Sequence, residues 1–283
     1  MNKDVKMLMN HKLKRRLNMI TGKNIVLTGC NSGIGLEVLK LLTKGNNNIL
    51  CVDKDVDVLS DYESDKVFVL QKDVSSQQAV DEIYEIAMEK FDFIDIFYAN
   101  AGYPYYEEMN YVDWNRVQRM FETNVFSPIY SYQKYVDYLD GRKGIFAITI
   151  SAIGQMAMPG FTIYSASKFA MEGFQQGIRF EKPDNVQLTC LYPVATNTNF
   201  FKAANEIEFK KPFPVQQPDV VARKMVAGIE SGKDTVSPCI LFGISKQLMK
   251  FMPPIKTAYL ALEKRKFKEF KAKVKEVKEF VAR

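Results

Sequence analysis

The stretch NIVLTGCNSGIGLEVLKLLTK, residues 24–44, predicts a β-strand, a glycine loop and a helix in succession. Glycines allow the backbone to turn tightly and to approach a pyrophosphate, and a helix N-terminus adds N–H groups and a positive dipole. In this context the pattern favours a dinucleotide-binding unit over a plain strand-to-helix turn. The loop residues that we expect to contact the dinucleotide are Gly29, Asn31, Ser32, Gly33, Ile34 and Gly35.

Beyond this unit, β-rich runs alternate with segments of helical spacing. Further strands are expected at 48–52, 67–71, 93–98, 145–150, 186–192 and 235–238, and helices at 75–90, 111–139, 164–180 and 218–231. This alternation predicts an α/β fold with a parallel sheet covered on both faces. We expect one folded domain over residues 19–240, because neither an internal repeat nor a low-complexity linker marks a second domain.

Candidate ligand-binding residues follow several of these strands. Asp53 lies 18 residues beyond Gly35, where an acid can bind ribose hydroxyls and repel a 2′-phosphate. It therefore predicts NAD rather than NADP, although Lys54 could offset the effect and an exposed loop acid is the alternative. Small residues after the strand expected at 93–98 would let a cofactor lie against the end of that strand. The further residues singled out at strand ends are Asp73, Val74, Asn100, Ala101 and Gly102.

A second group combines a hydroxyl, a phenol and an amine. Tyr164 and Lys168 are four residues apart, so a helix places them on one face, where an ammonium would lower the pKa of the phenol. Ser151 follows a predicted strand, at the edge where open α/β sheets bind ligands. Asn124 lies in an apolar stretch and must find hydrogen-bond partners. The alternative for the pair is a Tyr164 that packs on its helix beside a solvated Lys168. The alternative for Asn124 is a core residue whose hydrogen bonds are satisfied.

Composition narrows the class of protein. The chain has 283 residues, 47% hydrophobic and 25% charged, as in an ordinary soluble protein, and no apolar run is long enough for a transmembrane helix. Four widely spaced cysteines predict free thiols in a reducing compartment, hence a cytoplasmic protein. The single histidine, His11, leaves no Ser-His-Asp triad in the body, and we expect no metal site.

Charge is concentrated at the two ends. The net charge is +6, but residues 1–18 carry +5 and residues 246–283 carry +8, so the body carries −7. An acidic body without a nucleic-acid motif argues against nucleic-acid binding. The basic leader, residues 1–18, could be a surface-binding helix, a disordered segment, or an upstream stretch that is not translated.

Residues 241–283 predict a basic amphipathic helical tail. Its apolar stripe would either attach peripherally to an anionic membrane or dock on the body or on a second subunit. The stripe consists of Leu260, Phe267, Phe270, Val274, Val277 and Val281. Before the tail, the proline-containing stretch 197–217 predicts a mobile loop or short helices over the ligand edge of the sheet, which would form a substrate lid.

Taken together, the separated motifs closely resemble the short-chain dehydrogenase/reductase family over roughly residues 21–240. The matching residues are Thr28-Gly29, Gly33-Ile34-Gly35, Asp73-Val74, Asn100-Ala101-Gly102, Asn124, Ser151, Tyr164 and Lys168. The resemblance implies a doubly wound Rossmann fold of about seven strands. It also implies cofactor contacts from Pro193, Val194 and Thr196, where Val194 replaces the glycine common in the family.

The resemblance further implies roles for four residues. Tyr164 would be the acid/base, Lys168 would lower its pKa and hold the nicotinamide ribose, and Ser151 would bond the reacting oxygen. Asn124 would support a water that relays protons to Lys168. The expected protein interconverts an alcohol and a carbonyl with NAD, or less readily NADP, on a small and apolar, lipid- or steroid-like substrate. A homodimer or homotetramer is the expected assembly.

Two alternatives remain. One is a membrane-recruited, dehydrogenase-like binding or regulatory module, which would not need all four residues. The other is a sugar-nucleotide epimerase or dehydratase, which is usually longer and has a separate C-terminal substrate domain.

Overall fold

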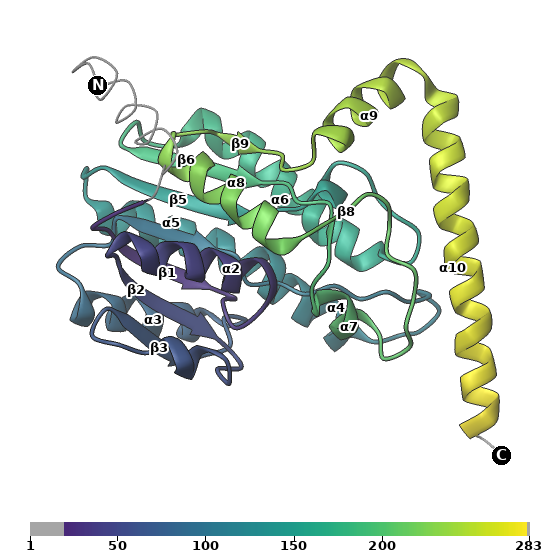
Figure 1. The fold of residues 1–283 in the computed structure, drawn as a ribbon, viewed down its shortest axis with the longest axis horizontal. Coiled ribbons are helices and arrows are strands. Elements are labelled where there is room, and N and C mark those ends of the chain that lie inside the picture. Colours follow the sequence, from purple (N-terminus) through teal and green to yellow (C-terminus); the bar gives the residue numbers. More distant parts are fainter. Residues whose placement is uncertain (1–19, 282–283) are drawn as a thin grey trace, which may run out of the picture.

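A seven-stranded parallel sheet forms the centre of the molecule, with helices on both faces (Figure 1). The computed structural model describes residues 20–281, so the leader predicted at 1–18 lies outside the described residues. The strand order is β3-β2-β1-β4-β5-β6-β9, which confirms the predicted doubly wound α/β fold. The strands are β1 (Asn24–Thr28), β2 (Asn48–Asp53), β3 (Val67–Gln71), β4 (Ile96–Ala99), β5 (Gly144–Thr149), β6 (Val186–Leu191) and β9 (Thr235–Val236).

Alternate residues of each strand enter two hydrophobic cores. Val26 of β1 faces one core, whereas its neighbours Ile25 and Leu27 face the other. The first core is closed by α3 (Gln77–Lys90), α5 (Ser127–Leu139) and α6 (Thr162–Glu181). The second is closed by α2 (Gly33–Leu42) and α8 (Pro218–Glu230). Because both faces are covered, most strand residues are apolar, although Gln187 and Thr189 alternate with apolar residues in β6.

The strand order reverses between β1 and β4. From β1 the chain proceeds outward to β2 and β3, then crosses to β4 and continues in the other direction. Open α/β sheets bind ligands at such a switch point, beyond the carboxyl ends of the strands. Thr28 connects the two strands there, because its hydroxyl oxygen accepts hydrogen bonds from the N–H groups of Asn100 and Ala101, each at 3.1 Å.

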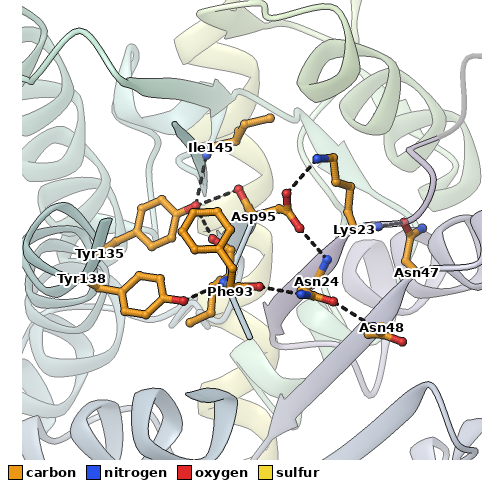
Figure 2. A network of polar contacts seen from close by, with 10 residues as sticks. Lys23, Asn24, Asn47, Asn48, Phe93, Asp95, Tyr135, Tyr138 and Ile145 are labelled. Carbon is orange, nitrogen blue, oxygen red and sulfur yellow. Dashed lines mark hydrogen bonds and ion pairs between the residues drawn. The ribbon is translucent and has the colours of Figure 1, made fainter. Parts of the chain in front are cut away.

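A polar network fastens the opposite edge of the sheet. Figure 2 shows the Asp95 carboxylate bound to the Lys23 ammonium at 2.7 Å and to the Asn24 N–H at 2.9 Å. In the same network the Tyr135 hydroxyl donates to the Asp95 carbonyl at 2.7 Å and accepts from the Ile145 N–H at 3.1 Å. The amino ends of β1, β4 and β5 are thereby connected, and the carboxyl edge remains for ligands.

The helix expected over residues 111–139 is interrupted. It comprises α4 (Trp114–Phe121), a π-helical turn (Glu122–Phe126) and α5. Pro128 has no N–H to donate to the carbonyl four residues earlier, and the Ser127 N–H bonds to the Glu122 carbonyl, five residues earlier. The wider turn directly precedes this proline, which disrupts the interior of a helix. It contains Asn124, one of the predicted site residues.

The predicted lid, residues 197–217, is partly regular. It includes α7 (Phe200–Ala204), and its end forms β8 (Val215–Gln216), which pairs with β7 (Ala195–Thr196) in a small parallel sheet. This pairing fixes both ends of the segment at the carboxyl edge of the main sheet.

The tail is helical, as predicted, but consists of two helices. Its parts are α9 (Ile240–Phe251) and α10 (Pro253–Val281), and the break falls at Pro253-Pro254, which cannot continue a preceding helix. Helix α10 lies along one end of the molecule (Figure 1). Within residues 20–281, every helix is too short or too polar to span a bilayer.

Most of the predicted apolar stripe of α10 is docked on the body. Phe270 is only 4% exposed, and its ring lies 4.7 Å from that of Tyr106, centroid to centroid. Ion pairs tie the same helix to the body, with 3.0 Å between Lys210 and Glu269. The stripe residues that belong to the hydrophobic cluster around Tyr106 are Leu260, Phe267, Phe270 and Val274. Val277, in contrast, is exposed. Of the alternatives for the stripe, the structure shows docking within the chain; the side chain of Val281 lies outside the described set.

Candidate active site

A cavity of about 400 Å³ opens at the carboxyl edge of the sheet. It brings together the glycine loop after β1, the strand ends of β2, β4 and β5, and the start of α6. Every residue predicted to contact the cofactor lines it, and so do Ser151, Tyr164 and Lys168. Those predicted for the cofactor are Gly29, Asn31, Ser32, Gly33, Ile34, Gly35, Asp53, Asp73, Val74, Asn100, Ala101, Gly102, Tyr164, Lys168, Pro193, Val194 and Thr196.

Asn100 and the start of helix α2 fix the conformation of the glycine loop. The Asn100 side chain donates to the Gly29 carbonyl at 2.9 Å and accepts from the Thr149 hydroxyl at 2.9 Å. Helix α2 begins so close to the loop that a Cβ on Gly35 would lie 2.0 Å from the Gly29 oxygen. The loop therefore requires glycine at position 35, and Asn100 acts on its shape through hydrogen bonds to the backbone.

The Asp53 carboxylate faces the same loop. It accepts the Asn31 N–H at 2.8 Å, so the acid is bound to the loop rather than being an exposed loop residue. Burial raises its pKa above the usual value for an aspartate. Two cationic residues, Lys54 and Lys72, also line the cavity.

Burial shifts the pKa values of both side chains of the Tyr164–Lys168 pair. Lys168 is 4% exposed, donates to the Thr149 carbonyl at 3.1 Å, and has its pKa lowered by desolvation to about 8. The Lys168 nitrogen is 5.7 Å from the centre of the Tyr164 ring. Burial raises the pKa of Tyr164, although a hydrogen bond with Ser151 opposes the rise. Burial therefore acts against the lowering of the Tyr164 pKa that we expected from the neighbouring amine, and the influence of Lys168 on the phenol stays a prediction.

Ser151 has an unusual backbone conformation. Its φ is +127°, a region that non-glycine residues rarely occupy, at a typical cost of about 1–3 kcal/mol. The conformation is held by hydrogen bonds on both sides: the Ile153 N–H donates to the Ser151 hydroxyl oxygen at 3.3 Å, and the Ala152 N–H donates to the Pro193 carbonyl at 2.9 Å. The surrounding structure therefore fixes the hydroxyl at the cavity wall.

Asn124 lies behind the cavity wall. Its amide donates to the Tyr103 carbonyl at 3.0 Å and to the Ser167 hydroxyl at 3.2 Å, and its oxygen accepts the Tyr103 N–H at 3.1 Å. A Cβ on Gly102 would lie 3.0 Å from that oxygen and 3.6 Å from the Lys168 nitrogen. Asn124 is therefore near Lys168 and anchors the loop after β4; its role in a water relay remains a prediction.

The other wall of the cavity is apolar, and its residues were not singled out from the sequence. They come from three distant segments: Ile153, Met156, Met158 and Phe161, then Phe200, Phe201 and Phe213 of the lid, and finally Phe242 and Tyr259 of the tail. No local motif marks them. Thr149, whose carbonyl holds Lys168, could have been found from its place at the end of β5, two residues before Ser151.

The cysteines and the possible metal-ligating side chains of the described residues do not form a second site. Cys30, Cys51, Cys190 and Cys239 are free thiols and all are buried. Within residues 20–281, no group of three His, Cys, Asp or Glu side chains is arranged to hold a metal ion.

Fold and cavity together define an α/β protein of the dinucleotide-binding type, with a Tyr–Lys pair at the switch point. The chain belongs to the short-chain dehydrogenase family, whose model matches residues 23–208. It is 26% identical over 237 residues to a protein of Danio rerio named 3-dehydrosphinganine reductase, covering 77% of this chain and 71% of the relative.

Solved structures show the same fold. The 3-ketoacyl-(acyl-carrier-protein) reductase of Brucella melitensis, complexed with NADH, has a TM-score of 0.68 at 21% identity; the match covers 77% of this chain and 96% of that one. A short-chain dehydrogenase of Sphingobium yanoikuyae, complexed with NADPH, has a TM-score of 0.69 at 20% identity, covering 81% and 95%.

Proposed function

We propose that this protein is a nicotinamide-dependent oxidoreductase that interconverts a secondary alcohol and a carbonyl. The observation that carries the proposal is a single cavity with the glycine loop at one end and Ser151, Tyr164 and Lys168 at the other. Family membership supports it, as do the fold neighbours whose structures contain NADH or NADPH.

The residues present fit such a cofactor. The glycine loop and the N-terminus of α2 would hold the pyrophosphate, and the Asp53 carboxylate would bind the adenosine ribose and disfavour a 2′-phosphate. The small residues Ala101 and Gly102 leave room along the end of β4, and Lys168 would hold the nicotinamide ribose. When bound, the cofactor supplies the hydride chemistry. We infer a preference for NAD over NADP.

Proton transfer falls to Tyr164. Because burial raises the pKa of this phenol, it holds its proton at neutral pH and would give it only to a strongly basic oxygen, such as the alkoxide that develops as a carbonyl is reduced. The Ser151 hydroxyl, which hydrogen-bonds Tyr164, would orient that oxygen. Lys168, whose pKa is about 8, is mostly protonated at neutral pH and can replace the lost proton.

The apolar wall indicates the substrate class. Aromatic and thioether side chains from the loop after β5, the lid and the tail surround the space beyond Tyr164. Such a lining favours a long apolar or steroid-like ketone over a sugar or an acid. The 3-dehydrosphinganine reductase relative supports a lipid substrate. A cytoplasmic location and a homodimer or homotetramer remain predictions.

The decisive test is a cofactor-absorbance assay with NADH and NADPH across long-chain and steroid ketones. Tyr164→Phe should lower turnover by at least about 100-fold, because it removes the proton donor. Cofactor affinity, measured by calorimetry, should be retained. Tyr130→Phe, at a helix α5 position outside the cavity, is the matched control. A wild-type chain that binds cofactor but turns over none of these ketones would instead favour a binding module.

A further inference from the structure

Helix α9 has an apolar face with no protein against it within the described chain. The side chains on it are well exposed, at 72% for Ile240, 57% for Ile244 and 79% for Phe251, and Leu241 and Leu248 belong to the same face. The opposite side of the helix is packed, since Phe242 is only 9% exposed and contacts a small cluster that includes Val194. Helix α9 is therefore amphipathic, with its larger apolar face outward.

All the charged side chains in the segment that carries this face are positive. No aspartate or glutamate occurs from residue 235 to residue 262, a segment that contains Lys246, Lys250 and Lys256. Lys250 and Lys256 flank the exposed turn formed by residues 251–255, in which Met252 is 52% exposed. This turn, between α9 and α10, stands clear of the sheet and its covering helices (Figure 1). A protruding apolar tip bordered only by lysines matches an anionic lipid surface.

A second copy of the chain fits this face less well. A two-fold contact through α9 would bring the same patch of each copy together, and therefore lysine against lysine. No acidic side chain within the segment 235–262 could neutralise them. Anionic head groups, in contrast, would neutralise the lysines while the apolar side chains enter the head-group region.

We propose that the outer face of α9 and the α9–α10 turn dock on anionic membranes, in place of the α10 stripe, which is packed on the body. Phe242 and Tyr259, which belong to the same segment, line the cavity, so docking would bring the apolar wall to the lipid surface. The proposal does not depend on the reaction, because lipid binding is measured without turnover.

Sedimentation of the full chain with phosphatidylcholine vesicles, with and without phosphatidylserine, tests the proposal. The intact chain should bind only when phosphatidylserine is present, and more weakly in high salt. Ile244→Ser combined with Phe251→Ser should weaken binding by at least about 10-fold, since two exposed apolar anchors are lost. Phe180→Ser, at an apolar residue of α6 that is 92% exposed, is the matched control and should bind as the wild type does.

Charge is tested separately. Lys250→Glu combined with Lys256→Glu should abolish the response to phosphatidylserine, whereas Lys273→Glu, at an exposed position of α10, should reduce it little. The proposal is overturned if the intact chain ignores phosphatidylserine, or if the α9 variants bind as the wild type does. It is equally overturned if the Ser variants instead dissociate a lipid-free oligomer, because a second copy then covers the face.

Discussion

Replacing Lys168 with methionine should stabilise the cofactor-free protein while abolishing its activity. The ammonium is 4% exposed, and burial lowers its pKa from 10.5 to about 8. This fall corresponds to about 3 kcal/mol spent in keeping the buried group charged near neutral pH. Methionine removes that cost but also the hydrogen bond to the Thr149 carbonyl, worth about 1 kcal/mol. We expect Lys168→Met to be about 2 kcal/mol more stable at neutral pH.

The pH dependence of the stability difference between Lys168→Met and the wild type tests whether burial of the lysine charge causes it. Below about pH 8 the lysine is charged in both folded and unfolded chains, so the folded state bears the full cost. As pH rises from 8 toward 10.5, the folded chain loses the proton first, and the wild type gains stability. The advantage of Lys168→Met should therefore shrink by about 2 kcal/mol between neutral pH and about pH 9.5.

The assay is urea unfolding of both proteins at the two pH values. Lys143→Met, at an exposed turn, is the control and should change the free energy of unfolding little at either pH. A Lys168→Met variant that is less stable than the wild type at neutral pH, or whose stability difference does not change with pH, would refute the argument.

Three further predictions test separate parts of the site. Ser151→Gly and Ser151→Ala should both lower turnover, but the glycine variant should be about 1–2 kcal/mol more stable than the alanine variant by thermal unfolding, because φ is +127°. Asp53→Ala should raise kcat/KM with NADPH relative to NADH; an unchanged ratio would remove the carboxylate from cofactor selection. Gly160→Ala should make α10 more sensitive to limited proteolysis, because a Cβ there would lie 2.4 Å from the Tyr106 ring and 2.8 Å from the Phe267 ring, and equal protection would contradict this role.

The fold and one half of the cavity follow from local patterns. Strand, glycine loop and helix occur in one continuous stretch, and residues at strand ends meet because parallel strands end at the same edge. For that reason Gly35, Asp53 and Ser151 could be placed from their positions alone.

Burial and long-range contacts could not be predicted in the same way. The pKa of Tyr164 depends on how many atoms exclude water from it, which spacing to Lys168 does not encode. The apolar stripe of α10 has the same periodicity whether it meets lipid or Tyr106. The interruption of the helix expected over residues 111–139 was, in contrast, open to prediction, because Pro128 lies inside that range.

Part of the apolar wall of the cavity lies beyond the residues that the family model matches. The family match ends at residue 208, whereas Phe213, Phe242 and Tyr259 lie beyond it. Substitutions in that last quarter of the chain can reshape the apolar wall without touching the glycine loop or Tyr164. Under the proposed function, a chain with an exchanged C-terminal segment is expected to keep the chemistry at Tyr164 and to accept a different molecule.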